Sequence, residues 1–333
     1  MRKIGASIRD VAKETGLSIA TVSRVMNGNA NVNSKTRQQV LDACERLDYL
    51  PNSAARALST SRSKTVAAII PTIEHSVFAK FISGIEQTLG EHGYSLVMAV
   101  SNADEKEELK AARKLLGMGA EAFILSGARH DTALLQSLLR HDVPHVFTSI
   151  WDPDNPVATI GYDNAKLAEE AVEYLVSMGH RKISVVHGPL FESDRTAARK
   201  EGAEKAANST TNLQFFETDL SISGGKAALG RLLSTNADCT AVLCFSDVLA
   251  MGVYFGLAET GKSIPKDLSV MGFDNLDWAG ETVPALTTIN LPASGMGRIV
   301  AKQIVQCLET GSPLRKQRLS AEIVERASVR QIT

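Results

Sequence analysis

The sequence predicts a small all-α N-terminal domain followed by an α/β body of two doubly wound parallel sheets. Three observations favour this fold class. The first sixty or so residues show short helical patterns separated by glycine and capping residues. From residue 66 onward, continuous apolar runs alternate with segments of helical periodicity. The chain has 333 residues, of which 44% are hydrophobic and 22% charged, a length and composition typical of about two globular domains.

The first element is a helix that begins after Ser7. Ser7 and Asp10 have the spacing of a capping box, with Asp in place of Glu. Gly16 can adopt the left-handed conformation that ends a helix, Leu17 can pack into the corner, and Ser18 can cap the next helix.

The second helix is predicted over residues 19–26. Val22 and Val25 point inward, which leaves an outer face made of Ile19, Ala20, Ser23 and Arg24. A short turn between two such helices is the geometry that enters a DNA major groove. Arg24 could then donate two hydrogen bonds to a guanine, and Thr21 and Ser23 could bind phosphate.

A third helix and a short fourth segment follow. We expect Ser34 to cap the third helix, and its core face to be Val40, Leu41, Cys44 and Leu47. Residues 53–59 form an alanine-rich segment with one large apolar side chain, and a helix this short is marginal alone in water. Residues 59–63 are serine-rich and are interpreted as a linker.

Charge separates these first residues from the rest of the chain. Residues 1–62 carry ten Lys or Arg against five Asp or Glu, whereas residues 63–333 carry 26 against 32. A basic head on an acidic body indicates a polyanionic partner for the head.

The head resembles the DNA-binding region of the LacI/GalR repressor family. The resemblance lies in the order and spacing of residues 8–12, 16–18, 21–27, 49–52 and 55–58. It implies that two subunits bind double-stranded DNA at a pseudo-palindromic, CG-centred operator, and that Leu58 wedges into a base step of the minor groove. The DNA-binding residues it implies are Ser18, Ile19, Ala20, Thr21, Ser23, Arg24, Asn27, Asn31, Asn52, Ala55, Arg56 and Leu58.

In the body, strand-like runs occur at 66–70, 95–100, 122–125, 145–147, 183–186, 213–216, 241–245 and 268–273. Helical crossovers between them, for example 76–91, 164–178 and 247–260, predict parallel sheets covered on both faces. The family resemblance extends through this region and implies a periplasmic-binding-protein-like sensor domain. We expect a head over 1–50, a hinge over 51–64 and an effector-binding domain over 65–333. Its N-subdomain would span about 65–161 and 292–322, and its C-subdomain about 162–291 and 323–333.

Ligands of such folds bind beyond the carboxyl ends of the strands. Asp274 and Arg199 are the strongest candidates, because a carboxylate and a guanidinium can each bind vicinal hydroxyl groups. Arg195 competes with Arg199 for that role, and Leu220 stands where some family members place an aromatic ring. The effector-binding residues implied are Thr72, Ser76, Phe78, Ser126, Trp151, Asp163, Arg199, Leu220, Asp247 and Asp274.

Other function classes find little support. The sequence lacks GxGxxG after the first strand, a complete P-loop, GxSxG and HExxH, so we expect no enzyme. The four cysteines are scattered without metal spacing, so we expect no metal and no cofactor. No signal peptide or long apolar run is present, which predicts a cytoplasmic protein.

The predicted function is a DNA-binding transcriptional regulator, a repressor of carbohydrate-metabolism genes, acting as a homodimer. Its effector would be a small sugar, sugar acid or phosphosugar. The alternative is a sugar-binding transport receptor, which the body alone would allow.

Overall fold

A computed structural model describes residues 6–26, 31–50, 62–74, 76–207, 209–236 and 238–332. The chain divides into two compact units, residues 1–64 and 65–333. None of the helices in the described segments has the length and apolar character needed to cross a membrane.

The first unit contains three helices around a small apolar core. They are α1 (Ile8–Thr15), α2 (Ile19–Met26) and α3 (Ser34–Arg46). Val11, Val22 and Val40 are fully buried between them. The predicted capping box is confirmed, because the Ser7 main-chain N–H donates to the Asp10 carboxylate over 2.8 Å.

The turn between α1 and α2 also has the predicted chemistry. Gly16 ends α1 with a φ of 69°, in the left-handed region that glycine adopts without strain. Ser18 caps α2, its hydroxyl accepting from the main-chain N–H of Thr21 at 3.1 Å. Leu17 packs against the core cluster from this corner.

Two predictions for α3 are wrong. Its cap is Asn33, whose side-chain oxygen accepts from the N–H of Thr36 at 2.7 Å, and Ser34 is the first helical residue. Leu41 is 44% exposed, and Ala43 is buried instead. The buried stripe runs through Val40, Ala43 and Cys44, because these positions share one face at helical spacing and Leu41 lies beside it.

The second unit contains two six-stranded sheets, which confirms the predicted fold class. Every strand pair in the first sheet is parallel, and only β12 is antiparallel to its neighbour in the second. The first sheet has the order β11 (Gln317–Arg318), β5 (Thr159–Gly161), β4 (His145–Thr148), β3 (Ala122–Ser126), β1 (Thr65–Ile70) and β2 (Ser95–Val100). The second has the order β12 (Glu322–Val324), β10 (Thr287–Asn290), β9 (Ser269–Asp274), β8 (Ala241–Cys244), β6 (Lys182–His187) and β7 (Asn212–Glu217).

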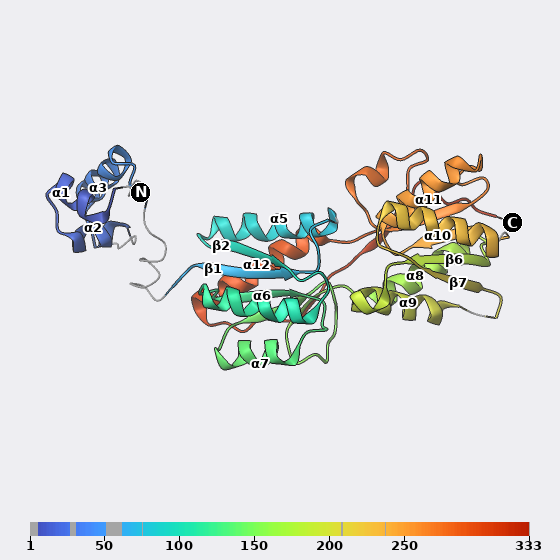
Figure 1. The fold of residues 1–333 in the computed structure, drawn as a ribbon, viewed down its shortest axis with the longest axis horizontal. Coiled ribbons are helices and arrows are strands. Elements are labelled where there is room, and N and C mark those ends of the chain that lie inside the picture. The colour runs from blue at the N-terminus through green and yellow to red at the C-terminus, as the bar shows by residue number, and fades with distance from the viewer. Residues whose placement is uncertain are drawn as a thin grey trace. The chain divides into compact units, whose positions relative to one another are not determined.

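Helices cover both faces of the first sheet (Figure 1). On one face, Val66 and Ala68 of β1 pack in a cluster with residues of α5 (Ser76–Glu91) and α12 (Ala293–Thr310). On the other face, Ala67 and Ile69 pack with α6 (Glu105–Gly117) and α7 (Thr132–Arg140). Both sets of side chains are buried, which explains why the strand reads as one continuous apolar run.

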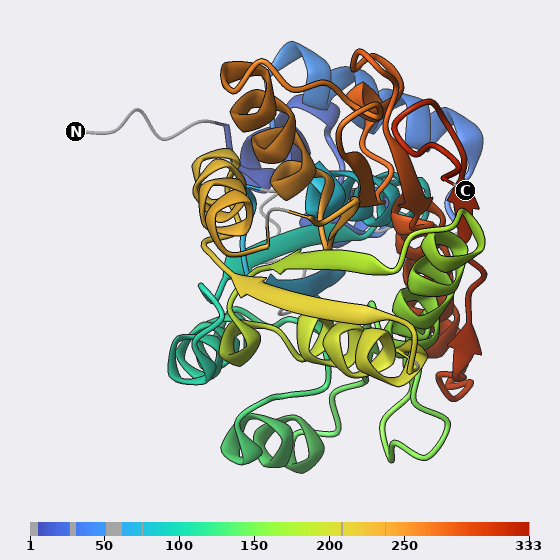
Figure 2. The ribbon, with the colours of Figure 1, turned by 90° about the vertical axis from the view of Figure 1, so that its right-hand side faces the viewer.

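The second sheet is covered in the same way (Figures 1 and 2). Val185 and Leu243 share a cluster with residues of α8 (Asn164–Ser177) and α9 (Asp194–Ala206). Val186 and Cys244 pack instead with α10 (Ile222–Thr235) and α11 (Asp247–Glu259). Short 3₁₀ turns, Leu190–Glu192 and Asp277–Gly280, follow β6 and β9.

The chain passes three times between the two sheets. It crosses after β5 and after β10, and then between β11 and β12. As a result, α12 packs on the first sheet beside α5, although it follows the strands of the second sheet in sequence.

Candidate functional site

The outward face of α2 is the first candidate site. Ile19 is 46% exposed, and Ala20 and Arg24 are also exposed, whereas Val22 and Val25 are buried. The face therefore combines apolar side chains near the helix start with one guanidinium further along. Such a face can contact thymine methyl groups and donate to guanine.

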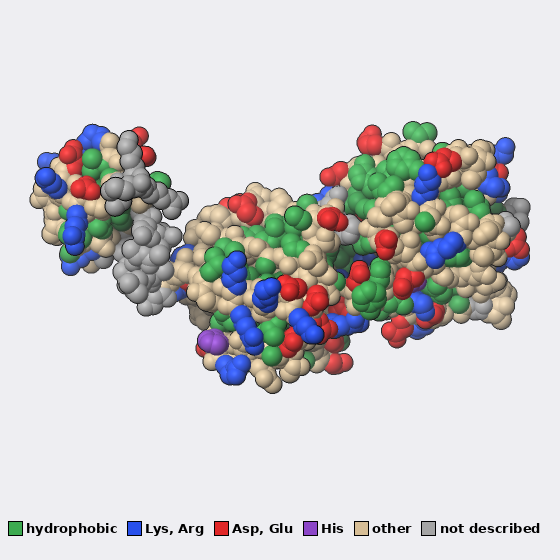
Figure 3. All heavy atoms as spheres, viewed as in Figure 1, with side chains coloured by type: hydrophobic (Ala, Val, Ile, Leu, Met, Phe, Trp, Pro, Cys, Tyr) green, Lys and Arg blue, Asp and Glu red, His purple; other side chains and the backbone are tan. Residues whose placement is uncertain are grey.

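Four other predicted DNA-binding residues lie in the described part of the head. Ser18 and Asn31 are exposed, and Thr21 and Ser23 are half-buried. Figure 3 shows Lys and Arg side chains on the visible face of the first unit. The remaining predicted residues lie outside the described part of the chain, namely Asn27, Asn52, Ala55, Arg56 and Leu58.

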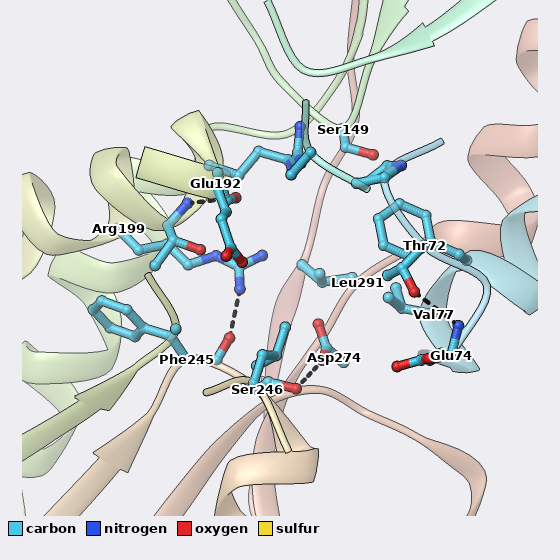
Figure 4. Close-up of a pocket in the computed structure, with 18 of the residues that line it drawn as sticks. Thr72, Glu74, Val77, Ser149, Glu192, Arg199, Phe245, Ser246, Asp274 and Leu291 are labelled. Atoms are coloured by element: carbon cyan, nitrogen blue, oxygen red, sulfur yellow. Dashed lines mark hydrogen bonds between the residues drawn. The ribbon is translucent and has the colours of Figure 1, made fainter. Parts of the chain in front are cut away.

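The second candidate site is a cavity of about 360 Å³ in the α/β unit. Its wall is formed largely by residues that directly follow strands, such as Thr72 after β1, Tyr162 after β5 and Ser246 after β8. Both sheets contribute, so the cavity lies at the carboxyl ends of the two sets of parallel strands, where this fold class binds ligands. Figure 4 shows Arg199 and Asp274 on different parts of the wall.

Arg199 is held in a fixed orientation on α9, with only 7% of its surface exposed. Its Nε donates to the side-chain oxygen of Asn164 at 3.0 Å, and one terminal nitrogen donates to the Phe245 carbonyl at 2.7 Å. Its guanidinium carbon lies 3.8 Å from the centre of the Phe273 ring. Burial lowers the pKa of Arg199, and the neighbouring Asp274 acts in the opposite direction.

Asp274 ends β9 and is 8% exposed. One of its oxygens accepts from the Ser246 hydroxyl at 2.9 Å. Burial raises the pKa of Asp274, while Arg199 and the Ser246 hydroxyl oppose that rise. The site thus offers a buried carboxylate as a hydrogen-bond acceptor and a buried guanidinium as a donor.

Of the predicted effector-binding residues, five line the cavity. These are Thr72, Phe78, Arg199, Leu220 and Asp274. Arg195, the predicted competitor of Arg199, also lines it, but its guanidinium is bound to Asp194 at 3.0 Å. Arg199 is the more deeply buried of the two. The side chain of Ser76 lies outside the described part of the chain.

The other four predicted residues do not line this cavity. Ser126 lines a separate cavity of about 50 Å³, and Trp151 is half-buried after β4. Asp163 caps α8, accepting from the Lys166 N–H at 2.9 Å.

Asp247 lies behind the cavity wall and holds it in place. Its two oxygens accept from the Leu276 N–H at 2.8 Å and the Thr288 hydroxyl at 2.6 Å. Burial raises the pKa of Asp247, and the nearby Asp274 raises it further.

Several lining residues were not predicted from the sequence. Ser246 directly precedes Asp247, and it is Ser246 that faces the cavity. Tyr162 and Ser149 follow β5 and β4 and line the wall together. Their position directly after a strand could have identified them from the sequence, because ligands of this fold class bind at the carboxyl ends of the strands. Glu192, which lies in a 3₁₀ turn, had no such signal.

A hydrogen bond and an ion pair link the two halves of the unit. Asp194 on α9 accepts from the N–H of Ala128, after β3, at 2.6 Å. Lys80 on α5 lies 2.7 Å from Asp277, after β9. These contacts link the two sheets' loops on either side of the site.

Comparison with known proteins identifies both units. Residues 7–52 match the family model described as bacterial regulatory proteins of the lacI family. Residues 63–324 match the model of periplasmic binding proteins and the sugar binding domain of the LacI family. The head and body resemblances predicted from the sequence are thereby confirmed.

Full-length relatives agree. Catabolite control protein A of Priestia megaterium is 30% identical over 307 residues, covering 91% of this chain and 92% of that protein. The structure of a LacI-family transcriptional regulator from Silicibacter pomeroyi is 25% identical, with a TM-score of 0.87 over 98% of this chain and 99% of that chain. A CelR–cellobiose complex is 27% identical, with a TM-score of 0.70 over 97% and 99% of the two chains. The chain belongs to the LacI family of bacterial regulatory proteins.

Proposed function

We propose that this regulator binds an operator as a cytoplasmic homodimer and that a small sugar in the cavity controls its DNA affinity. The observation that carries the proposal is the presence, in one chain, of a helix-turn-helix head and a cavity that includes fixed polar side chains in its lining. A transport receptor would need the cavity but would have no use for the head.

On the DNA side, the support comes from α2. Its exposed face presents Ile19, Ala20 and Arg24, and its first turn is capped by Ser18. A dimer would place two such helices in successive major grooves, which requires a pseudo-palindromic site. The hinge prediction, in which Leu58 opens a CG step, is part of this proposal.

On the effector side, the support comes from Arg199 and Asp274. A carboxylate and a guanidinium, each pre-oriented by other hydrogen bonds, can bind hydroxyl groups with little reorganisation. The relative CelR has been solved with cellobiose. We therefore assign a carbohydrate to this cavity.

The mechanism we propose is a population shift. An effector that binds both halves of the α/β unit favours the closed arrangement, in which Asp194 meets Ala128 and Lys80 meets Asp277. The half that continues into the head then changes the spacing of the two DNA-reading helices. Couplings of this kind are typically about 1–3 kcal/mol.

The DNA part of the proposal is tested by selecting binding sites from a random duplex pool with the full chain, followed by footprinting. We expect an enriched two-fold symmetric sequence with two protected half-sites. A chain that enriches no sequence, or protects a single half-site as a monomer, would contradict the proposal.

A further inference from the structure

We propose that the cavity selects an uncharged polyhydroxyl ligand and discriminates against sugar acids and sugar phosphates. This inference rests on the proposed effector role of the cavity. The sequence left sugars, sugar acids and phosphosugars open as ligand classes, and this inference keeps only the neutral sugars.

The charges on the cavity wall are predominantly negative. Carboxylates line it at Glu74, Glu192, Asp219 and Asp274, and guanidinium groups at Arg195 and Arg199. Among the described lining residues, carboxylates outnumber guanidinium groups, and Glu74, Glu192 and Asp219 are exposed to solvent. A phosphate or carboxylate entering the cavity therefore meets more charges of its own sign than of the opposite sign.

Arg195 does not offset this excess, because its charge is already paired. It lies 3.0 Å from Asp194, which also accepts from the Ala128 N–H at 2.6 Å. Burial opposes ionisation of Asp194, but Arg195 and the main-chain N–H groups outweigh it and lower the pKa of Asp194. The pair is thus an ionised carboxylate with its own counter-charge.

Among the described lining residues, Arg199 is the cationic group left to face an anion, and its geometry is poorly suited to one. Carboxylates and phosphates bind arginine most strongly through two parallel N–H groups. The edge that includes Nε is occupied by Asn164, and one terminal nitrogen already donates to the Phe245 carbonyl. The remaining N–H groups can still donate to hydroxyl oxygens.

Of the helices that begin at the cavity, α9 and α11 have occupied N-termini, whereas α5 and α12 have no acidic residue in their first turn. Both α9 and α11 begin at the cavity, and each begins with an aspartate, Asp194 and Asp247. Serine side chains cap them as well, Ser193 accepting from Thr196 N–H and Ser246 from Val248 N–H. One main-chain N–H at the start of each of these two helices therefore already has an acceptor within the protein.

What remains on the wall suits hydroxyl groups. Asp274 accepts, Arg199 donates, and Tyr162 and Ser149 can do both. Figure 4 shows the Glu192 side chain directed into the cavity. A sugar ring, with hydroxyl groups that both donate and accept, can satisfy this mixture without bringing a charge.

The test is calorimetry of the full chain with matched ligand sets at neutral pH and low salt. Each set contains a neutral sugar, its sugar acid and its phosphate ester, for example glucose, glucuronate and glucose 6-phosphate, with parallel sets for galactose and ribose and with cellobiose as a larger neutral probe. In the set that binds, we expect the neutral member to bind at least about tenfold more tightly than either anion. Glu192→Gln should reduce the ratio of neutral to anionic affinity by roughly threefold or more, because it removes one negative charge that faces the cavity.

Glu201→Gln is the matched control, since Glu201 is exposed on α9 and does not line the cavity. It should leave the ratio unchanged. An anionic member that binds more tightly than its neutral partner, with binding lost in Asp274→Asn, would overturn the uncharged class while leaving the effector site intact. Failure of every member of every set to bind would overturn both this inference and the proposed carbohydrate effector.

Discussion

Arg24 is the side chain on which sequence reading by the head is expected to depend. It is exposed on the same face of α2 as Ile19 and Ala20, while the opposite face is buried. Arg24→Ala should weaken operator binding by about 1–3 kcal/mol and relax the preference at one base position. The measurement is fluorescence anisotropy on operators that differ at single base pairs.

The control for Arg24→Ala is to compare its loss of affinity on different DNA sequences. If Arg24 only touched phosphate, the loss would be the same on every duplex. Uniform weakening on specific and unrelated DNA would therefore contradict a base-reading role.

Asp247 provides a residue-scale test of the cavity wall. Its pKa is raised by burial, so the folded chain keeps a proton that the unfolded chain has lost above about pH 4. This retained proton stabilises the folded state in full below about pH 4, and the stabilisation is lost as the pH rises through the raised pKa of Asp247.

Asp247→Asn cannot ionise, yet its amide oxygen can still accept from the Leu276 N–H. The melting temperature of the variant relative to the wild type should thus rise between about pH 5 and about pH 8. Differential scanning calorimetry across that range provides the measurement. A difference that stays constant with pH would show that Asp247 carries its charge without penalty.

The sequence predicted only part of the cavity lining. The family resemblance implied Thr72, Arg199 and Asp274 as candidates, and all three line the cavity. It also implied Asp247, but Ser246, the residue before it at the start of α11, lines the cavity instead.

At the scale of elements, buried strands and helix caps were the most predictable features. All eight predicted strands are present. Six of them are largely buried, as expected for strands covered on both faces, whereas β2 and β7, at the edges of their sheets, are only partly buried. The short strands β5, β10, β11 and β12 were not among these eight, and none of them is longer than four residues. The cap of α3 was misplaced by one residue because Asn33 and Ser34 are both good caps.

The packing of α5 against α12 depends on glycine. A methyl group at Gly84 would lie 2.3 Å from the Ser294 carbonyl oxygen, closer than contact allows. Gly84→Ala should therefore lower the free energy of unfolding by about 1–3 kcal/mol. Urea denaturation of the full chain, followed by circular dichroism, measures this change.

Gly90 in the same helix is the matched control. A methyl group there would meet nothing within 4 Å, so Gly90→Ala should be neutral or should stabilise by up to about 1 kcal/mol through helix propensity. Equal effects of the two substitutions would argue against a close α5–α12 contact.

At the scale of the whole molecule, the chain separates reading DNA from sensing a ligand. The basic excess lies in residues 1–62 and the acidic excess in the remainder. This division keeps the polyanion-binding charge on the head, while the described lining of the cavity includes more carboxylates than guanidinium groups. The three chain crossings between the sheets provide the route by which closure around a ligand can move one half relative to the other.

The measurement that tests this account most directly is operator affinity with and without the sugar that the calorimetry identifies, in the wild type and in Asp274→Asn. A saturating sugar should change the wild-type dissociation constant for the operator by about 5- to 150-fold. The variant should bind the operator as the wild type does without sugar and should show no change when sugar is added. A sugar that fills the cavity yet leaves operator affinity unchanged in the wild type would contradict the coupling of the cavity to DNA binding.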